Sequence, residues 1–168
     1  MTHLFLVRHG ETIDNVNKIM QGQTQGELTE QGRMQALGVM RRMENRHIDA
    51  FISSDLKRAV DTCRIIAQPH GMEVRKTVLL RERDWGGFTG RYIPDLKDVP
   101  WPDDVETQEQ LLARAAMFVE FVKKEYPGLT VLAVGHGIIN KAIQAALFNK
   151  AMRDVPRMDN AEVRCLVL

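Results

Sequence analysis

The chain has 168 residues, of which 44% are hydrophobic and 27% are charged, as is ordinary for a globular protein. A chain of this length buries about 70% of its unfolded surface, so we expect one domain over residues 1–168 that needs no metal or disulfide for its core. The 23 basic and 22 acidic residues nearly balance, which gives no reason to expect a nucleic-acid or membrane partner.

The cysteines and the N-terminal segment exclude several further classes of protein. Cys63 and Cys165 lie far apart in the sequence and form no C-x-x-C pair, so they do not predict a zinc site. The apolar run Leu4–Val7 is shorter than the apolar part of a signal peptide. No stretch approaches the ~20 apolar residues of a membrane span. We therefore expect a cytoplasmic protein without a metal or cofactor.

Strands and helices alternate in the N-terminal half. Residues 4–7 form a short apolar run that predicts a buried strand, and residues 30–46 predict an amphipathic helix. The apolar face of that helix is expected to comprise Met34, Leu37 and Met40. Residues 50–52 predict a second strand, after which Ser54 is expected to cap a helix that begins at the acidic residue Asp55.

The alternation continues in the C-terminal half. Residues 73–79 predict a third strand, and Thr107 followed by Gln110 is a capping box that opens a helix. The buried face of this helix is expected to comprise Leu111, Ala115, Phe118 and Val122. The nearly continuous apolar run at residues 130–134 predicts a central strand, which a further helix follows, and residues 162–168 predict the last strand.

This alternation predicts an α/β fold, a three-layer α/β/α sandwich with a mostly parallel central sheet. In such sheets ligands bind beyond the carboxyl ends of the strands. Arg8 and His9 follow the first predicted strand, and Arg58 lies early in the helix after the second. Glu82 follows the third strand, and His136 follows the strand at residues 130–134. We expect these five side chains to converge at one end of the sheet.

The residue types in this group favour phosphoryl transfer. Two guanidinium groups match the oxygens of a phosphoryl group and stay charged at neutral pH. A neutral imidazole can attack phosphorus, and nearby cations favour the neutral form. A carboxylic acid can protonate the leaving oxygen and then, as a carboxylate, activate water. The second imidazole can donate a hydrogen bond to an oxygen of the transition state.

The motifs around these residues resemble those of the histidine phosphatase superfamily, in its phosphoglycerate mutase-like branch. Arg8-His9-Gly10-Glu11-Thr12 with Asn15 resembles the signature R-H-G-x-T-x-x-N. The other matching blocks, in family order, are Gly22-Gln23, Leu28–Gly32, Ser53–Ala59 with Thr62, Leu80–Glu82 with Gly86 and Gly90, and Val134–Gly137. Several blocks in order over nearly the whole chain are a specific signal.

The resemblance implies a role for each matched residue. His9 would be the phosphorylated nucleophile, and Glu82 would be the proton donor and later the general base. The phosphoryl group would be bound by Arg8, Asn15, Gly22, Gln23, Arg58, His136 and Gly137. The family uses no metal for this step. Asp84 and Glu106 lie near enough in the sequence to remain alternatives to Glu82.

Features of the sequence give opposing indications of the branch of the family. Trp85 stands where mutases tend to carry Tyr, and Thr89 stands where many phosphatases carry Glu, which both favour a mutase. The short segment 91–106 lacks the long insertion of mutases, and the chain ends at Leu168, which both favour a phosphatase. Trp85 and Trp101 flank the expected pocket, where they could contact substrate or cover the core.

We therefore expect a phosphatase that hydrolyses small-molecule phosphomonoesters, such as a phosphosugar or an α-ribazole phosphate, and releases inorganic phosphate. A mutase of reduced size is the alternative within the family. A phosphate-binding or regulatory module without turnover is the alternative from another class, and hydrolysis of phosphoproteins ranks below these. Substrate specificity is expected to reside in residues 16–27, 84–106 and 149–161. The sequence does not indicate an oligomeric state.

Overall fold

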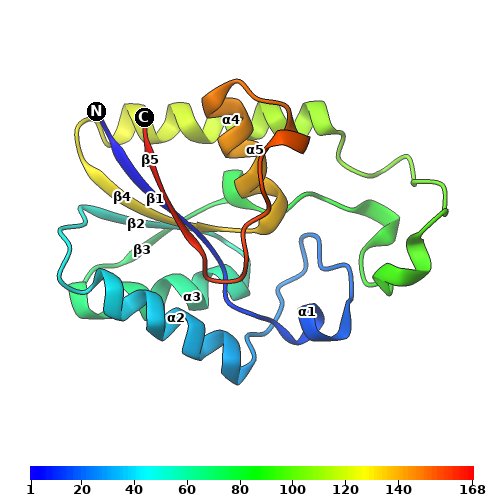
Figure 1. Cartoon of the computed structure of the whole chain (residues 1–168), viewed down its shortest axis with the longest axis horizontal. Coiled ribbons are helices and arrows are strands. Elements are labelled where there is room, and N and C mark those ends of the chain that lie inside the picture. Colours follow the sequence, from blue (N-terminus) through cyan, green and yellow to red (C-terminus); the bar gives the residue numbers. More distant parts are fainter.

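The computed structural model describes residues 1–168 and contains a five-stranded sheet between two layers of helices (Figure 1). The strand order is β3-β2-β4-β1-β5. The strands are β1 (His3–Arg8), β2 (Ala50–Ser54), β3 (Val74–Thr77), β4 (Thr130–Gly135) and β5 (Val163–Val167). The first four are parallel, and β5 pairs antiparallel with β1. The predicted mostly parallel sheet is confirmed, with β4 at its centre.

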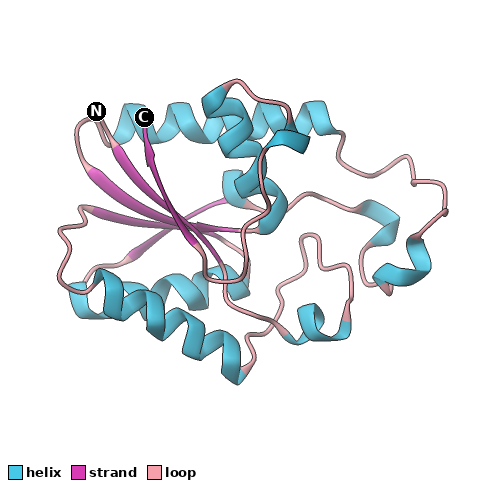
Figure 2. Ribbon diagram, viewed as in Figure 1, coloured by secondary structure: helices cyan, strands magenta, loops and turns pink.

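Helices cover both faces of the sheet, as Figure 2 shows. The helices are α1 (Ile13–Asn17), α2 (Glu30–Met43), α3 (Lys57–Ala67), α4 (Gln108–Glu125) and α5 (Gly137–Phe148). Helices α4 and α5 pack together on one face, and α2 and α3 pack together on the other. None of the helices is long and apolar enough to cross a membrane. The three-layer sandwich that the sequence predicts is confirmed.

The apolar runs of the central strands supply both halves of the core. Successive side chains of a strand point to opposite faces of the sheet. In β4, Val131 and Ala133 join the cluster under α4 and α5, whereas Leu132 and Val134 join the cluster under α2 and α3. A strand covered on both faces therefore needs apolar residues at every position, which is why residues 130–134 form an uninterrupted run.

The predicted buried face of α2 is wrong. The buried residues of this helix are Gly32, Ala36, Val39 and Met43. Met34 is 51% exposed, whereas Leu37 and Met40 are half-buried at the flank of the stripe. Gly32 sets the rotation of the helix, because it packs so closely on the backbone of Glu11 that a Cβ atom at this position would collide with the Glu11 carbonyl. The helix also ends at Met43 rather than at residue 46.

The predicted start of α3 is also wrong, because two tertiary contacts compete with the cap. Helix α3 begins at Lys57, and Leu56 precedes it without a side-chain cap. The Ser54 hydroxyl does accept the N–H of Leu56 at 3.2 Å, but Leu56 has extended backbone, and the same hydroxyl contacts His136 Nε2 at 2.9 Å. The Asp55 carboxylate pairs with Arg81 at 2.6 Å instead of serving the first turn of a helix.

The prediction for β3 is wrong at its end, whereas the prediction for α4 is confirmed. Strand β3 is shorter than predicted, because residues Val78–Leu80 form a 3₁₀ turn that leads towards Glu82. The capping box of α4 is confirmed, since the Thr107 hydroxyl accepts the Gln110 N–H at 3.1 Å and the Gln110 side chain accepts the Thr107 N–H at 3.0 Å. The predicted buried face of α4 is confirmed as well.

Candidate active site

A cavity of about 200 Å³ lies beyond the carboxyl ends of the parallel strands. In Figure 1, α1 and the segment between β3 and α4 gather on this side of the sheet. The polar side chains of the cavity wall are Arg8, His9, Asn15, Gln21, Arg58, Glu82 and Arg157. Segments far apart in the sequence therefore converge at the end of the sheet that the topology predicts.

His9 is buried and has one ring nitrogen free for chemistry. Its Nδ1 lies 2.7 Å from the carbonyl oxygen of Gly10, so Nδ1 carries the hydrogen and Nε2 keeps its lone pair. Burial lowers the pKa of His9 well below its ordinary value, and the charges of Arg58 and Arg8 lower it further. His9 is therefore a neutral imidazole at physiological pH, which is the nucleophilic form.

The backbone around His9 is fixed by contacts with two helices. The N–H of Gly10 donates to the hydroxyl of Thr62 in α3 at 3.1 Å. A Cβ atom on Gly10 would collide with the carbonyl of Gly32 in α2, so only glycine allows this close approach. The orientation of the His9 ring therefore depends on the packing of both helices beneath the sheet.

Arg8 and Arg58 are two buried guanidinium groups with donors to spare. Arg8 donates from Nη1 to the carbonyl of Met158 at 2.8 Å, and Arg58 donates from Nη2 to the carbonyl of Gly22 at 2.8 Å. The Nε of each arginine is buried and has no partner in the protein. Burial lowers the pKa of Arg58 to about 10 and lowers that of Arg8 as well, so both stay charged at neutral pH.

Arg58 also shapes the loop that closes one side of the cavity. Besides Gly22, its guanidinium donates to the carbonyls of Thr24 and Gln25. The side chain is only 1% exposed, an unusual burial for an arginine. A single residue thus provides charge to the cavity and holds residues 22–25 in place.

His136 lies directly against His9, although it does not line the cavity. The two ring centroids are 5.1 Å apart. His136 is fully buried, and its Nδ1 has no partner in the protein. Burial lowers the pKa of His136 well below its ordinary value, with further contributions from Arg58 and His9. The site therefore holds two adjacent neutral imidazoles.

The Glu82 carboxylate lines the cavity and meets the N-terminus of α5. Its Oε1 accepts the N–H groups of Arg83 at 2.9 Å and Ile139 at 3.0 Å, and its Oε2 accepts the N–H of Ile138 at 3.1 Å. A helix N-terminus favours a negative charge, and these bonds fix the position of the side chain. Glu82 is thus the one carboxylate in the wall of the cavity that contains His9.

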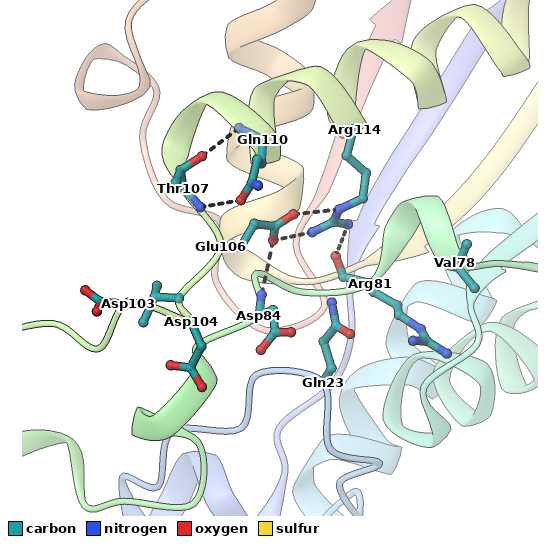
Figure 3. Close-up of a pocket in the computed structure, with 11 residues that line it drawn as sticks. Gln23, Val78, Arg81, Asp84, Asp103, Asp104, Glu106, Thr107, Gln110 and Arg114 are labelled. Atoms are coloured by element: carbon teal, nitrogen blue, oxygen red, sulfur yellow. Dashed lines mark hydrogen bonds and ion pairs between the residues drawn. The ribbon is translucent and has the colours of Figure 1, made fainter.

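The two alternatives to Glu82 lie in a neighbouring pocket, shown in Figure 3. Glu106 forms an ion pair with Arg114 at 2.8 Å and accepts the N–H of Asp84 at 3.1 Å. The Asp84 carboxylate accepts the N–H of Gly86 at 2.9 Å. Asp84 and Glu106 therefore hold the loop around Glu82 and do not face His9.

The remaining predicted site residues do not all line the His9 cavity. Asn15 lines the His9 cavity, and its Oδ1 accepts the N–H of Thr12 at 3.0 Å, which leaves its NH₂ group available. Gly22 also lines this cavity. Gln23 lines the pocket of Figure 3 instead and donates to the carbonyl of Glu82 at 3.2 Å. Gly137 begins α5 outside the cavity wall.

Sequence reasoning missed two polar residues of the cavity. Gln21 lines it, and its Oε1 accepts the hydroxyl of Thr12 at 2.9 Å. Arg157 comes from the irregular segment between α5 and β5, and its charge lowers the pKa of both His9 and Arg8. Both lie in segments expected to carry specificity, but neither belongs to a recognisable motif. The chain has no group of three or more His, Cys, Asp or Glu residues placed to hold a metal ion.

Several known proteins are similar to this chain in sequence over most of its length. The profile of the histidine phosphatase superfamily (branch 1) matches residues 4–168. Glucosyl-3-phosphoglycerate phosphatase of Mycobacterium tuberculosis is 33% identical over 92% of this chain and 79% of its own length. The metal-independent phosphoserine phosphatase of Arabidopsis thaliana is 34% identical over 85% of this chain and 67% of its own. The "probable phosphoglycerate mutase GpmB" of Enterobacter sp. is 34% identical over 82% and 71%, respectively.

The fold is shared as well. A solved structure of mycobacterial glucosyl-3-phosphoglycerate phosphatase in complex with VO3 matches with a TM-score of 0.90 at 30% identity, over 98% of this chain and 92% of that one. This likeness confirms the phosphoglycerate mutase-like architecture that the motifs predict. The chain therefore belongs to the histidine phosphatase superfamily, branch 1.

Proposed function

We propose that this protein is a phosphatase that hydrolyses small phosphomonoesters through a phosphohistidine on His9, without a metal ion, and releases inorganic phosphate. The family and the two relatives named as phosphatases support a phosphoric monoester hydrolase. The observation that carries the proposed mechanism is the state of His9: it is buried and neutral, and its free Nε2 belongs to a ring that lines a cavity with two guanidinium groups.

In the first step the ester phosphate binds between Arg8 and Arg58, which both line the cavity. Nε2 of His9 attacks phosphorus and forms the N–P bond while the bond from phosphorus to the ester oxygen breaks. The departing alkoxide takes a proton from the Glu82 carboxyl group. His136, which lies against His9, provides a second imidazole close to the transferred group.

In the second step water attacks the phosphohistidine. The Glu82 carboxylate takes a proton from this water, the N–P bond breaks, and inorganic phosphate leaves with His9 again neutral. The three N–H bonds to Glu82 hold its carboxyl group in the cavity wall, and the second step uses this group as a carboxylate. The first step requires the protonated form, so Glu82 alternates between the two within each turnover.

The test is hydrolysis of 4-nitrophenyl phosphate and a panel of small phosphoesters in EDTA, with wild type and His9→Ala compared. We expect turnover in the wild type and none in the variant, whereas His3→Ala, at an exposed position, should behave as the wild type. An acid-labile phosphoprotein should accumulate when the reaction is quenched during turnover. Hydrolysis that persists in His9→Ala would contradict the covalent mechanism.

Mutase activity is the second candidate, because one relative carries the name of a phosphoglycerate mutase. A mutase must keep its intermediate from water while the substrate reorients. In this chain segment 91–106 contributes only Ile93 to the cavity wall, and Trp101 in the same segment is 57% exposed, which suits hydrolysis better. Transfer between the 2- and 3-positions of phosphoglycerate, without release of phosphate, would instead establish the mutase. A chain that binds phosphate but supports neither reaction would be a non-catalytic binding module.

A further inference from the structure

A second cavity, of about 330 Å³, lies beside the one that contains His9. We call it the apolar annex, and it is lined by Met20, Trp85, Phe88, Ile93, Leu96, Lys97 and Trp101. Six of these seven residues are hydrophobic, and Lys97 supplies the one polar side chain. The annex thus differs from the reaction cavity, whose wall carries seven polar side chains.

The annex lies outside the two hydrophobic clusters of the sheet, although Phe88 in its wall is itself buried. None of its residues is a member of the two clusters that hold the sheet to its helices. Trp101 is 57% exposed and Ile93 is 44% exposed, so folding leaves much of this apolar surface in water. Concave apolar surface of this kind marks a binding site more often than it serves stability.

The aromatic walls of the annex are held in place by one arginine. The guanidinium of Arg83 lies 4.9 Å from the ring centroid of Trp85 and 5.1 Å from that of Trp101. The two indole rings meet edge-to-face at 5.4 Å, and Phe88 meets Trp101 at 6.3 Å. Cation–π and edge-to-face contacts of this kind fix ring orientation, so the walls exist before any ligand arrives.

Backbone hydrogen bonds fix the opposite wall. The N–H of Met20 donates to the carbonyl of Arg91 at 2.9 Å, and the N–H of Gly90 donates to the carbonyl of Met20 at 2.8 Å. The N–H of Ile93 donates to the carbonyl of Lys18 at 2.8 Å. Two loops that are distant in the sequence are therefore joined where the annex opens.

The annex adjoins the reaction cavity directly, because Met20, Trp85 and Ile93 line both. We propose that the annex binds the alcohol part of the substrate and selects an apolar alkyl or aryl group there, while the phosphoryl group lies at His9. This inference rests on the proposed function. The expected occupant follows from the continuity of the two cavities. The alcohol part of the substrate is bonded to the phosphate, so it lies beside these three shared residues.

The lining also argues against a polar occupant. A sugar hydroxyl group that moves from water into the annex would lose its hydrogen bonds, and the side chains of the annex offer in return only donors, from Lys97 and the two indole N–H groups. An alkyl or aryl group gains from the same transfer. Full burial of each methylene group improves binding by about fourfold.

The test compares a series of alkyl phosphates from methyl to hexyl, with phenyl phosphate, in the wild type, Trp101→Ala and Trp101→Phe. We expect kcat/KM of the wild type to rise with each methylene, by up to about fourfold, mainly through KM. In Trp101→Ala the ratio of hexyl to methyl kcat/KM should fall by about tenfold, and Trp101→Phe should restore most of it. Met117→Ala, at an exposed position of α4, is the control and should keep the wild-type ratio.

Binding of alkyl phosphonates, which cannot be hydrolysed, separates the annex from the proposed reaction. Calorimetry should show that hexylphosphonate binds more tightly than methylphosphonate, and that Trp101→Ala removes most of this difference. Equal affinities across the series in the wild type would overturn the proposal that the annex binds an alkyl or aryl group, even if every ester is hydrolysed. If no ester is hydrolysed but affinity still rises with chain length, the proposed function fails, whereas the proposed binding role of the annex is supported.

Discussion

The two buried imidazoles should make the stability of the folded chain depend on pH in a defined direction. The pKa values of His9 and His136 lie well below the ordinary value, mainly because both rings are buried. Between the ordinary pKa of about 6.5 and the lower folded value, the unfolded chain binds protons that the folded chain does not. Lowering the pH through this window therefore reduces the free energy of unfolding.

The size of the effect follows from the ordinary pKa alone, provided that both rings stay neutral when folded. For one imidazole with an unfolded pKa of about 6.5, the loss between pH 7 and pH 5 is about 2 kcal/mol. Two such groups give about 4 kcal/mol, against a total stability of about 5–15 kcal/mol for a typical domain. Acidification to pH 5 should therefore remove a large share of the stability.

Urea unfolding at pH 7 and pH 5 measures this loss directly. In His9→Gln or His136→Gln the loss should be smaller by about 2 kcal/mol than in the wild type. His3→Gln, at an exposed position, should leave the loss unchanged. Carboxyl groups that titrate in the same range are common to all the variants and cancel in the comparison. Equal losses in the wild type and both buried-site variants would refute the conclusion that these imidazoles are held neutral.

Four further predictions concern single positions. Glu82→Gln should lower turnover by about 10²–10⁴ while phosphate binding, measured by calorimetry, changes little. Arg157→Gln removes a cation that lowers the pKa of His9, so that pKa should rise and the acid limb of the kcat/KM profile should move to higher pH; an unmoved limb would refute this electrostatic effect of Arg157. Gly32→Ala should destabilise the fold by about 1–3 kcal/mol in urea unfolding, because the new methyl group meets backbone. In Gly38→Ala, in the same helix, the new methyl group has no neighbour within 4 Å. This variant should be more stable by about 0.5–1 kcal/mol, because alanine has the higher helix propensity. A loss of stability would show that helix propensity does not determine the effect at this position.

The sheet and the reaction cavity could be predicted because their residues follow a pattern. A strand covered on both faces must be apolar throughout, and the carboxyl ends of parallel strands meet at one edge. These two constraints identify β4 as central and bring Arg8, His9, Arg58 and Glu82 into one cavity. The capping box at Thr107 is a local signal and was predicted for the same reason.

The errors arise where a tertiary contact overrides a local preference. Ser54 and Asp55 are good residues for the start of a helix, yet the Ser54 hydroxyl contacts His136 as well as the N–H of Leu56, and the Asp55 carboxylate pairs with Arg81. The face of α2 is rotated because a glycine contact between backbones decides which side turns inward. No periodicity or propensity encodes such a contact, since it depends on a segment elsewhere in the chain.

The residues proposed for catalysis and the residues expected to determine specificity differ in the same way. The groups proposed for catalysis stand at or near strand ends, where the core fixes the backbone and the sequence pattern is strong. Arg157, Gln21 and the residues of the apolar annex stand on loops that are fixed by individual hydrogen bonds and ring contacts. Loops of this kind can change sequence without loss of the core. Relatives with this fold can therefore differ in substrate while the residues around His9 stay the same, and the loops are where such differences should be sought.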